Sequence, residues 1–191
     1  MAPRSARKRP LLLFASNFFK HPRMLGSIIP SSPFLINELL SEVDWSRARV
    51  VVEYGPGVGT ITMEMLKRMR PDAKMVVIEM NEDFVRFLRE VKDPRLHVVH
   101  GSAADVIDVL HGLGEDHADY VVSGIPFSTM PGDVRDAIMA ATRDALRPDG
   151  NFLVYQFSKH AGPYLRRVFK RVKQGYQPLN ILPAHLWFCT P

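Results

Sequence analysis

The chain has 191 residues, of which 46% are hydrophobic and 24% charged, as expected for one globular domain with a terminal extension. No apolar run approaches the roughly 20 residues of a membrane-spanning helix, and the only cysteine, Cys189, excludes an internal disulfide and a cysteine metal cluster. Six basic and no acidic residues stand in residues 1–37 and again in residues 150–191, whereas residues 38–149 carry 13 basic and 20 acidic residues. These positive ends favour contact with a polyanion, either nucleic acid or an anionic membrane.

The N-terminal part of the chain is predicted to be helical. Residues 10–20 show the spacing of an amphipathic helix, with apolar and polar side chains on opposite sides. A basic start before apolar residues also resembles a signal peptide, but the apolar core, residues 11–15, is too short for one. We expect this helix to lie on a surface, either that of a membrane or that of the protein itself. A second helix is predicted over residues 33–43, with Ser31 or Ser32 as its N-cap.

Strands and helices alternate through the rest of the chain. The predicted strands cover residues 49–54, 74–80, 96–99, 119–123 and 151–157, and the predicted helices cover residues 60–69, 82–91, 131–146 and 162–172. The tail, residues 179–190, is expected to add one or two closing strands. This alternation predicts parallel βαβ units and therefore an α/β fold. An extension, residues 1–46, is expected to precede the main α/β domain, residues 47–191.

The most informative motif is Glu53-Tyr54-Gly55-Pro56-Gly57-Val58-Gly59-Thr60, where the first predicted strand turns into a helix. Its glycines let the backbone approach a ligand at the carboxyl ends of the strands. Glu79 ends the second strand 20 residues after Gly59, a spacing at which a carboxylate accepts hydrogen bonds from ribose. The spacing G-x-G-x-G lacks the third glycine of the dinucleotide fingerprint, and Glu53 would repel a pyrophosphate but attract the cationic end of a methionine moiety. These features favour S-adenosylmethionine.

Residues 48–157 resemble the class I S-adenosylmethionine-dependent methyltransferases. The resemblance implies a Rossmann-like α/β fold, with a mostly parallel seven-stranded sheet flanked by helices, and S-adenosyl-L-methionine as the cofactor. It implies cofactor binding by Glu53, Gly55, Pro56, Gly57, Gly59, Thr60, Glu79, Met80, Ser102 and Ala103. Ser102 stands where an aspartate is common in this family, and Asp105 is either that acid displaced or a helix cap.

The fourth predicted strand ends in Ser123-Gly124-Ile125-Pro126-Phe127. This block resembles the acceptor motif of amino-methyltransferases, N-L-P-Y or N-I-P-F in the ribosomal RNA adenine dimethylases. In that motif a side-chain carbonyl and the following backbone carbonyl hold a planar amino group, and the aromatic ring stacks on the base. The resemblance makes these five residues the catalytic site. Ser123 or Gly124 stands in place of the asparagine, and the chain leaves no residues for an appended RNA-binding domain, so nucleic acid is the less favoured substrate.

A narrower resemblance is to the short bacterial phospholipid N-methyltransferases that act on phosphatidylethanolamine. It is carried by Phe18–Ser32, the S-G-I-P-F block and Asn180-Ile181-Leu182-Pro183-Ala184. It implies stepwise methylation towards phosphatidylcholine by a peripheral membrane enzyme that uses no metal. We expect a cytoplasmic monomer on the inner face of the cell membrane. The N-terminal extension would bind the anionic membrane and cover the cofactor. The alternatives are an enzyme like the ribosomal RNA adenine N6-dimethyltransferases and a binding protein without catalysis.

A phospholipid amine is largely protonated at neutral pH, so an N-methyltransferase must favour its free base. Three side chains are candidates for a general base, namely Tyr54, His160 and His185. The sequence selects none of them.

Overall fold

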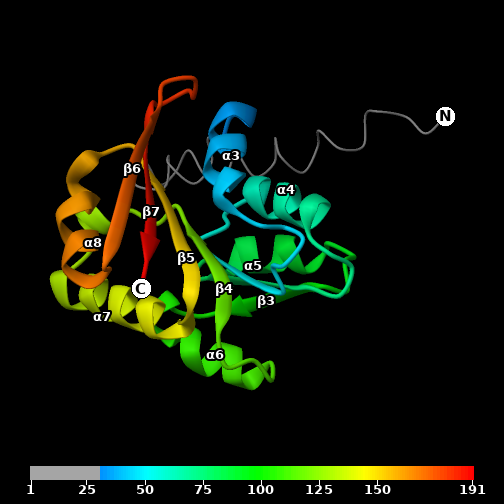
Figure 1. Cartoon of the computed structure of the whole chain (residues 1–191). Coiled ribbons are helices and arrows are strands. Elements are labelled where there is room, and N and C mark those ends of the chain that lie inside the picture. Colours follow the sequence, from blue (N-terminus) through cyan, green and yellow to red (C-terminus); the bar gives the residue numbers. More distant parts are fainter. Residues whose placement is uncertain (1–30) are drawn as a thin grey trace.

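The computed structural model describes residues 31–191, and in this part of the chain seven strands form one sheet in the order β3-β2-β1-β4-β5-β7-β6 (Figure 1). The strands are β1 (Val50–Tyr54), β2 (Lys74–Glu79), β3 (Leu96–His100), β4 (Ala118–Ser123), β5 (Leu146–Gln156), β6 (Arg171–Gln177) and β7 (Ala184–Thr190). The pairs among β1 to β5 are parallel, whereas β7 runs antiparallel to β5 and β6. The predicted mostly parallel, seven-stranded α/β fold is confirmed.

Helices cover both faces of the sheet, with α3 and α4 on one side and α7 and α8 on the other (Figure 1). The α-helices are α3 (Pro33–Leu39), α4 (Thr60–Arg68), α5 (Glu82–Arg89), α6 (Val106–Gly112), α7 (Gly132–Ala145) and α8 (Gly162–Val168). Short 3-10 helices are η2 (Leu40–Glu42), η3 (Ala103–Asp105), η4 (Phe127–Thr129) and η5 (Lys159–Ala161). One core layer joins α3, α4 and α5 to the sheet, and the other joins α6, α7 and α8. Because β1 is covered on both faces, all five of its residues are buried.

Part of the predicted N-terminal extension is visible, and it packs against the sheet. Ser32, one of the two predicted N-caps, begins α3, and its side chain accepts a hydrogen bond from the Leu35 amide at 3.1 Å. Leu35 and Leu39 are fully buried in the core layer beneath α3. The predicted amphipathic helix, residues 10–20, lies outside the described residues.

The structure differs from the predicted elements in two places, at α6 and at the junction of α8 with β6. The helix α6 was not predicted. The helix predicted over residues 162–172 ends at Val168, and the chain continues into β6 from Arg171. Because β6 is an edge strand with mostly exposed or half-exposed side chains, it lacks the hydrophobic alternation that identifies a strand. The tail therefore supplies one strand, β7, and the hairpin partner of this strand is β6, which precedes the tail in the sequence.

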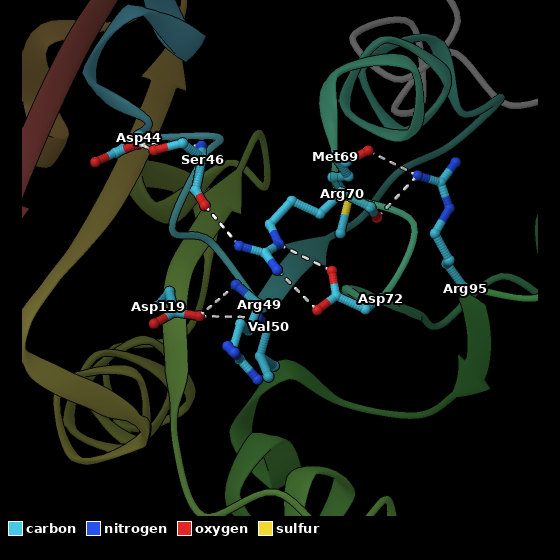
Figure 2. A network of polar contacts seen from close by, with 9 residues as sticks. All are labelled: Asp44, Ser46, Arg49, Val50, Met69, Arg70, Asp72, Arg95 and Asp119. Atoms are coloured by element: carbon cyan, nitrogen blue, oxygen red, sulfur yellow. Dashed lines mark hydrogen bonds and ion pairs between the residues drawn. The ribbon is translucent and has the colours of Figure 1, made fainter.

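The amino-terminal edge of the sheet is held by a polar network (Figure 2). One oxygen of Asp119 accepts hydrogen bonds from the backbone amides of Arg49 and Val50, each at 2.8 Å. Arg70 pairs with Asp72 through two hydrogen bonds and donates a third to the Ser46 carbonyl. Asp119, Arg70 and Asp72 therefore have structural partners, and they lie at the end of the sheet opposite the glycine turn.

We expect Asp119→Ala to lower the free energy of unfolding by about 1–3 kcal/mol, because two backbone amides would lose their acceptor. Urea denaturation followed by circular dichroism measures this change. The matched control is Asp116→Ala, which removes an exposed acid from the turn before β4. Equal stability of the two variants would contradict a structural role for Asp119.

Candidate functional site

The glycine turn between β1 and α4 has the backbone conformation that its sequence predicts. Gly55, Gly57 and Gly59 have φ angles of 64°, 56° and 75°, a region that other residues rarely adopt. A Cβ atom on Gly55 would lie 2.6 Å from a methyl carbon of Ile125, and one on Gly59 would lie 2.7 Å from Leu88. The turn is therefore packed tightly against the acceptor motif on one side and α5 on the other.

Glu79 connects the second strand to this turn. One of its carboxylate oxygens accepts a hydrogen bond from the Gly57 amide at 3.2 Å, and the other accepts one from the Asn81 amide at 2.9 Å. Each oxygen keeps a second lone pair, so Glu79 can still accept hydrogen bonds from two ribose hydroxyls. The side chain that follows, Met80, is 74% exposed and offers an apolar surface to a purine ring.

The η3 loop lies beside the end of β2. The Gly101 amide donates to the Glu79 carbonyl at 3.1 Å, and the Ser102 hydroxyl caps η3 by accepting from the Ala104 amide at 3.1 Å. Ala103 is buried in the core layer of α6 and α7. Asp105 makes no capping hydrogen bond to α6. The structure thus brings Gly57, Glu79 and the η3 loop together, as the predicted cofactor site requires.

Glu53 is a buried carboxyl group on the α4 side of the sheet. It is 3% exposed, and the Thr62 hydroxyl donates a hydrogen bond of 2.5 Å to it. Burial raises the pKa of Glu53 to about 8, the Thr62 hydrogen bond opposes this rise, and the charge of Glu79 adds to it. A cation beside Glu53 would favour its ionised form. The neighbouring glycines, Glu53 and Glu79 fit S-adenosylmethionine, whose amino group and sulfonium are cationic and whose ribose presents hydroxyls.

We expect cofactor binding to release a proton from Glu53. At pH 7 a group with a pKa of about 8 is protonated in the free protein, and a bound cation would shift it to the carboxylate. Binding should therefore tighten as the pH rises towards 8. Calorimetry in two buffers of different ionisation enthalpy measures the released protons. Glu53→Gln should reduce this release, and a binding enthalpy independent of the buffer would contradict the expectation.

Glu79→Ala is expected to weaken cofactor binding by about 1.5–3 kcal/mol, the range for hydrogen bonds to a charged group. The change removes the acceptor for ribose and also frees the Gly57 amide. Titration calorimetry with S-adenosylhomocysteine measures the affinity. Glu90→Ala, at an exposed acid that ends α5, is the matched control. Unchanged affinity in a folded Glu79→Ala protein would remove Glu79 from the ribose site.

The predicted acceptor motif is divided between the core and the surface. The side chains of Ser123 and Phe127 are fully buried, whereas Pro126 is exposed and Gly124 and Ile125 are half-buried. Phe127 packs edge-on against Phe152, with 6.1 Å between ring centroids. Its ring thus belongs to the core layer of α7.

The Ile125 carbonyl is engaged within the protein. It accepts hydrogen bonds from the Gln156 side chain at 2.7 Å and from the Phe127 amide at 3.0 Å. A carbonyl oxygen has two lone pairs, so these donors satisfy it. Gln156, at the end of β5, was not predicted as a site residue.

Tyr155 is the main residue that sequence reasoning missed. A Cβ atom on Gly124 would lie 2.3 Å from both Cζ and the hydroxyl oxygen of Tyr155, so the tyrosine occupies the space of any side chain at this position. Burial and the charge of Glu53 raise the pKa of Tyr155 above its ordinary value, and a hydrogen bond with the Ser31 side chain opposes this rise. The sequence did offer one signal for a site role of Tyr155, namely its position near the carboxyl end of a predicted parallel strand, where ligands bind in such sheets.

The three candidate bases lie in different surroundings. The Tyr54 hydroxyl bonds to Thr142 of α7 at 3.1 Å, on the face opposite Glu53 and Tyr155. His160 is exposed in η5. Nδ1 of His185 is buried and has no hydrogen-bond partner among residues 31–191. In the same range no group of three or more His, Cys, Asp or Glu side chains is arranged to hold a metal ion, and no helix is long and apolar enough to cross a membrane.

Comparison with known proteins identifies similar sequences. A family model described as ribosomal RNA adenine dimethylase matches residues 18–124. An ornithine lipid N-methyltransferase of Singulisphaera acidiphila is 35% identical over 190 residues, which make up 95% of this chain and 96% of that protein. A ribosomal RNA small subunit methyltransferase A of Clostridium perfringens is 27% identical over 111 residues, which make up 57% of this chain but 38% of that protein.

A solved structure with the same fold contains the product form of the expected cofactor. It is the 1,6-didemethyltoxoflavin-N1-methyltransferase of Burkholderia thailandensis, bound to 1,6-didemethyltoxoflavin and S-adenosylhomocysteine. It superposes with a TM-score of 0.63 at 16% identity, over 100% of this chain and 92% of its own. This likeness shows the fold, a Rossmann-like methyltransferase sheet with its last strand antiparallel.

Proposed function

This chain belongs to the class I S-adenosylmethionine-dependent methyltransferases, within the family described as ribosomal RNA adenine dimethylase, and we propose that its acceptor is the aliphatic amine of a membrane lipid headgroup. The match to an ornithine lipid N-methyltransferase over 95% of the chain supports a lipid acceptor and favours ornithine lipid. Phosphatidylethanolamine, which the sequence resemblance implies, is the second acceptor to test. Both lipids carry an aliphatic amine.

The observation that carries this proposal is the crowding of Gly124 by Tyr155. An asparagine side chain at this position, which would hold a planar amino group, would have space only if the Tyr155 side chain moved away from Gly124. The Ile125 carbonyl, the other acceptor of that motif, is already satisfied by two donors. The buried ring of Phe127 is also unavailable for stacking on a base. The site therefore favours an amine with tetrahedral geometry over the planar amine of adenine.

Bound S-adenosylmethionine would supply an activated methyl group, so the chain's own residues mainly have to orient the acceptor and exclude water. The Tyr155 hydroxyl can accept a hydrogen bond from one N–H of the amine, which leaves the nitrogen lone pair free to attack. Partial burial of the site favours the neutral amine over its ammonium form. Glu79 and Gly57 would hold the ribose at the carboxyl edge, and Glu53 would face the methionine end.

An enzyme with a lipid acceptor must work where its substrate lies. We therefore place it as a peripheral protein on the inner face of the cell membrane. The predicted helix over residues 10–20, outside the described residues, is expected to contribute to this contact through its apolar side and its basic neighbours.

A tritiated-methyl assay tests the proposed function. It offers vesicles with ornithine lipid, vesicles with phosphatidylethanolamine, and ribosomal RNA side by side to the full chain. We expect label in lipid and none in RNA. Label in RNA alone would overturn the proposal in favour of an adenine methyltransferase, and no label in any substrate would overturn it in favour of a binding protein.

A further inference from the structure

The loop between β6 and β7 presents apolar side chains to solvent. Leu179, Ile181 and Leu182 are 59%, 70% and 41% exposed, and we refer to these three residues as the apolar tip. The loop projects beside α3 (Figure 1), whose first turn carries a further exposed aromatic residue, Phe34. Soluble proteins rarely expose a contiguous patch of apolar side chains unless that patch binds a partner.

Hydrogen bonds hold the apolar tip in place. The Ser32 amide donates to the side chain of Asn180 at 2.8 Å, and the Ser32 hydroxyl donates to the Leu179 carbonyl at 2.6 Å. Within the loop, the Asn180 side chain donates to the Leu182 carbonyl at 2.9 Å. Because the Asn180 side chain and the Leu179 and Leu182 carbonyls have partners within the protein, the apolar side chains can enter an apolar medium without leaving these polar atoms unpaired.

The apolar tip lies at the same edge of the sheet as the acceptor site. Strand β7 is antiparallel to β5, and His185 at its start pairs with Gln156 at the end of β5. Ser31, which bonds to Tyr155, directly precedes the residue that holds the loop. A lipid whose amine reaches Tyr155 therefore has its acyl chains on this side of the molecule.

The charge around the apolar tip suits an anionic surface. Residues 150–191 contain six basic residues and no acid, although Arg171 and Lys173 lie towards the end of β6 away from the loop. The side chains of Lys159 and His160 are exposed in η5, just after β5 and at the edge where the apolar tip lies. Glu38 of α3, the acid that faces the end of β6, accepts a hydrogen bond from Gln177. An apolar loop with a lysine exposed at the same edge, on a C-terminal segment that carries no acid, suits an anionic bilayer interface.

We propose that the apolar tip inserts into the interface of an anionic bilayer and directs the acceptor site towards the lipid headgroups. This inference rests on the proposed lipid acceptor, and it assigns a membrane contact within the folded domain in addition to the one proposed for the helix predicted over residues 10–20. Residues 1–30 or a second copy of the chain are the competing occupants of this surface.

A fluorescent label on the apolar tip tests insertion directly. Ile181→Cys can be labelled selectively with nitrobenzoxadiazole because the native Cys189 is fully buried. On vesicles of phosphatidylcholine and phosphatidylglycerol, the full-length labelled protein should show a blue-shifted, brighter emission. Val134→Cys, at a 41% exposed position on α7, is the matched control and should show no change. An unchanged emission at residue 181 with vesicle-bound protein would overturn the proposal.

A second variant, Leu179→Ser/Ile181→Ser/Leu182→Ser, tests the role of the tip in catalysis. We expect its vesicle affinity to fall about tenfold or more, and methylation of vesicle lipid to fall with it. Binding of S-adenosylhomocysteine and methylation of a short-chain, monomeric acceptor lipid should be unchanged. Unchanged vesicle binding would overturn the proposal, in favour of a second copy if sedimentation velocity shows lost dimers, or of residues 1–30 if limited proteolysis shows their release.

The two proposals fail in different ways. If wild-type protein methylates neither vesicle lipid nor short-chain lipid, the proposed acceptor is wrong. The emission of the label at residue 181 still decides whether the tip enters the bilayer, because that signal does not depend on methyl transfer.

Discussion

Phe127→Ala is expected to lower the free energy of unfolding by about 3–5 kcal/mol, because it removes a fully buried ring and leaves a cavity. The lost contacts include the edge-on packing against Phe152. Urea denaturation monitored by circular dichroism measures the change. Phe157→Ala, which removes a ring that is 37% exposed at the end of β5, is the matched control and should cost much less.

A more conservative variant, Phe127→Leu, separates packing from catalysis. It keeps most of the buried volume, so a purely structural residue should retain both stability and lipid methylation at a near-native level. Native stability combined with a large loss of methylation would instead give the aromatic ring a direct part in aligning the acceptor. The sequence resemblance alone predicted that second result.

Gly124→Ala is expected to lower the rate of lipid methylation about 100-fold, the scale of loss that follows from misplacing a reacting group by about an ångström. The new methyl group would occupy space held by the Tyr155 ring, at 2.3 Å from two of its atoms. Since the end of a side chain can rotate away, the fold should survive while the Tyr155 hydroxyl leaves the acceptor site. Initial rates with saturating S-adenosylmethionine measure the loss.

Two further variants make this result specific. Gly112→Ala, where a Cβ atom would meet nothing within 4 Å, should leave the rate unchanged. Tyr155→Phe keeps the ring but removes the hydroxyl, and should lower methylation without weakening S-adenosylhomocysteine binding. Wild-type rates in both Gly124→Ala and Tyr155→Phe would exclude Tyr155 from the acceptor site.

The sequence by itself determined the class of fold and the position of the cofactor turn. These features depend on local patterns, such as buried valine runs, glycines at a strand end and an acid that ends the next strand. Gly55, Gly57 and Gly59 all adopt left-handed conformations, and Glu79 does reach the Gly57 amide. The glycine turn forms within a short stretch of backbone. The residues that can be recognised in the sequence are therefore the same residues that build the turn.

Local pattern was insufficient where an element depends on its neighbours. The basic residues near Arg166–Lys173 satisfied a helical pattern, but those from Arg171 onward form β6, because they pair with β7 along its full length. The pairing forms a hairpin, but the mostly exposed or half-exposed side chains of this edge strand carry little of the hydrophobic alternation that identifies a strand.

Only the tertiary structure decided what surrounds the predicted acceptor motif. In the sequence, Gly124 stands where the acceptor motif has an asparagine. This departure leaves the identity of the acceptor open between lipid and RNA. In the fold, β4 and β5 pair in register, so that Tyr155 lies over Gly124, and Gln156 reaches the Ile125 carbonyl. These contacts join residues about 30 positions apart, and contacts across neighbouring strands arise from the pairing of the sheet, which no local spacing in the chain specifies.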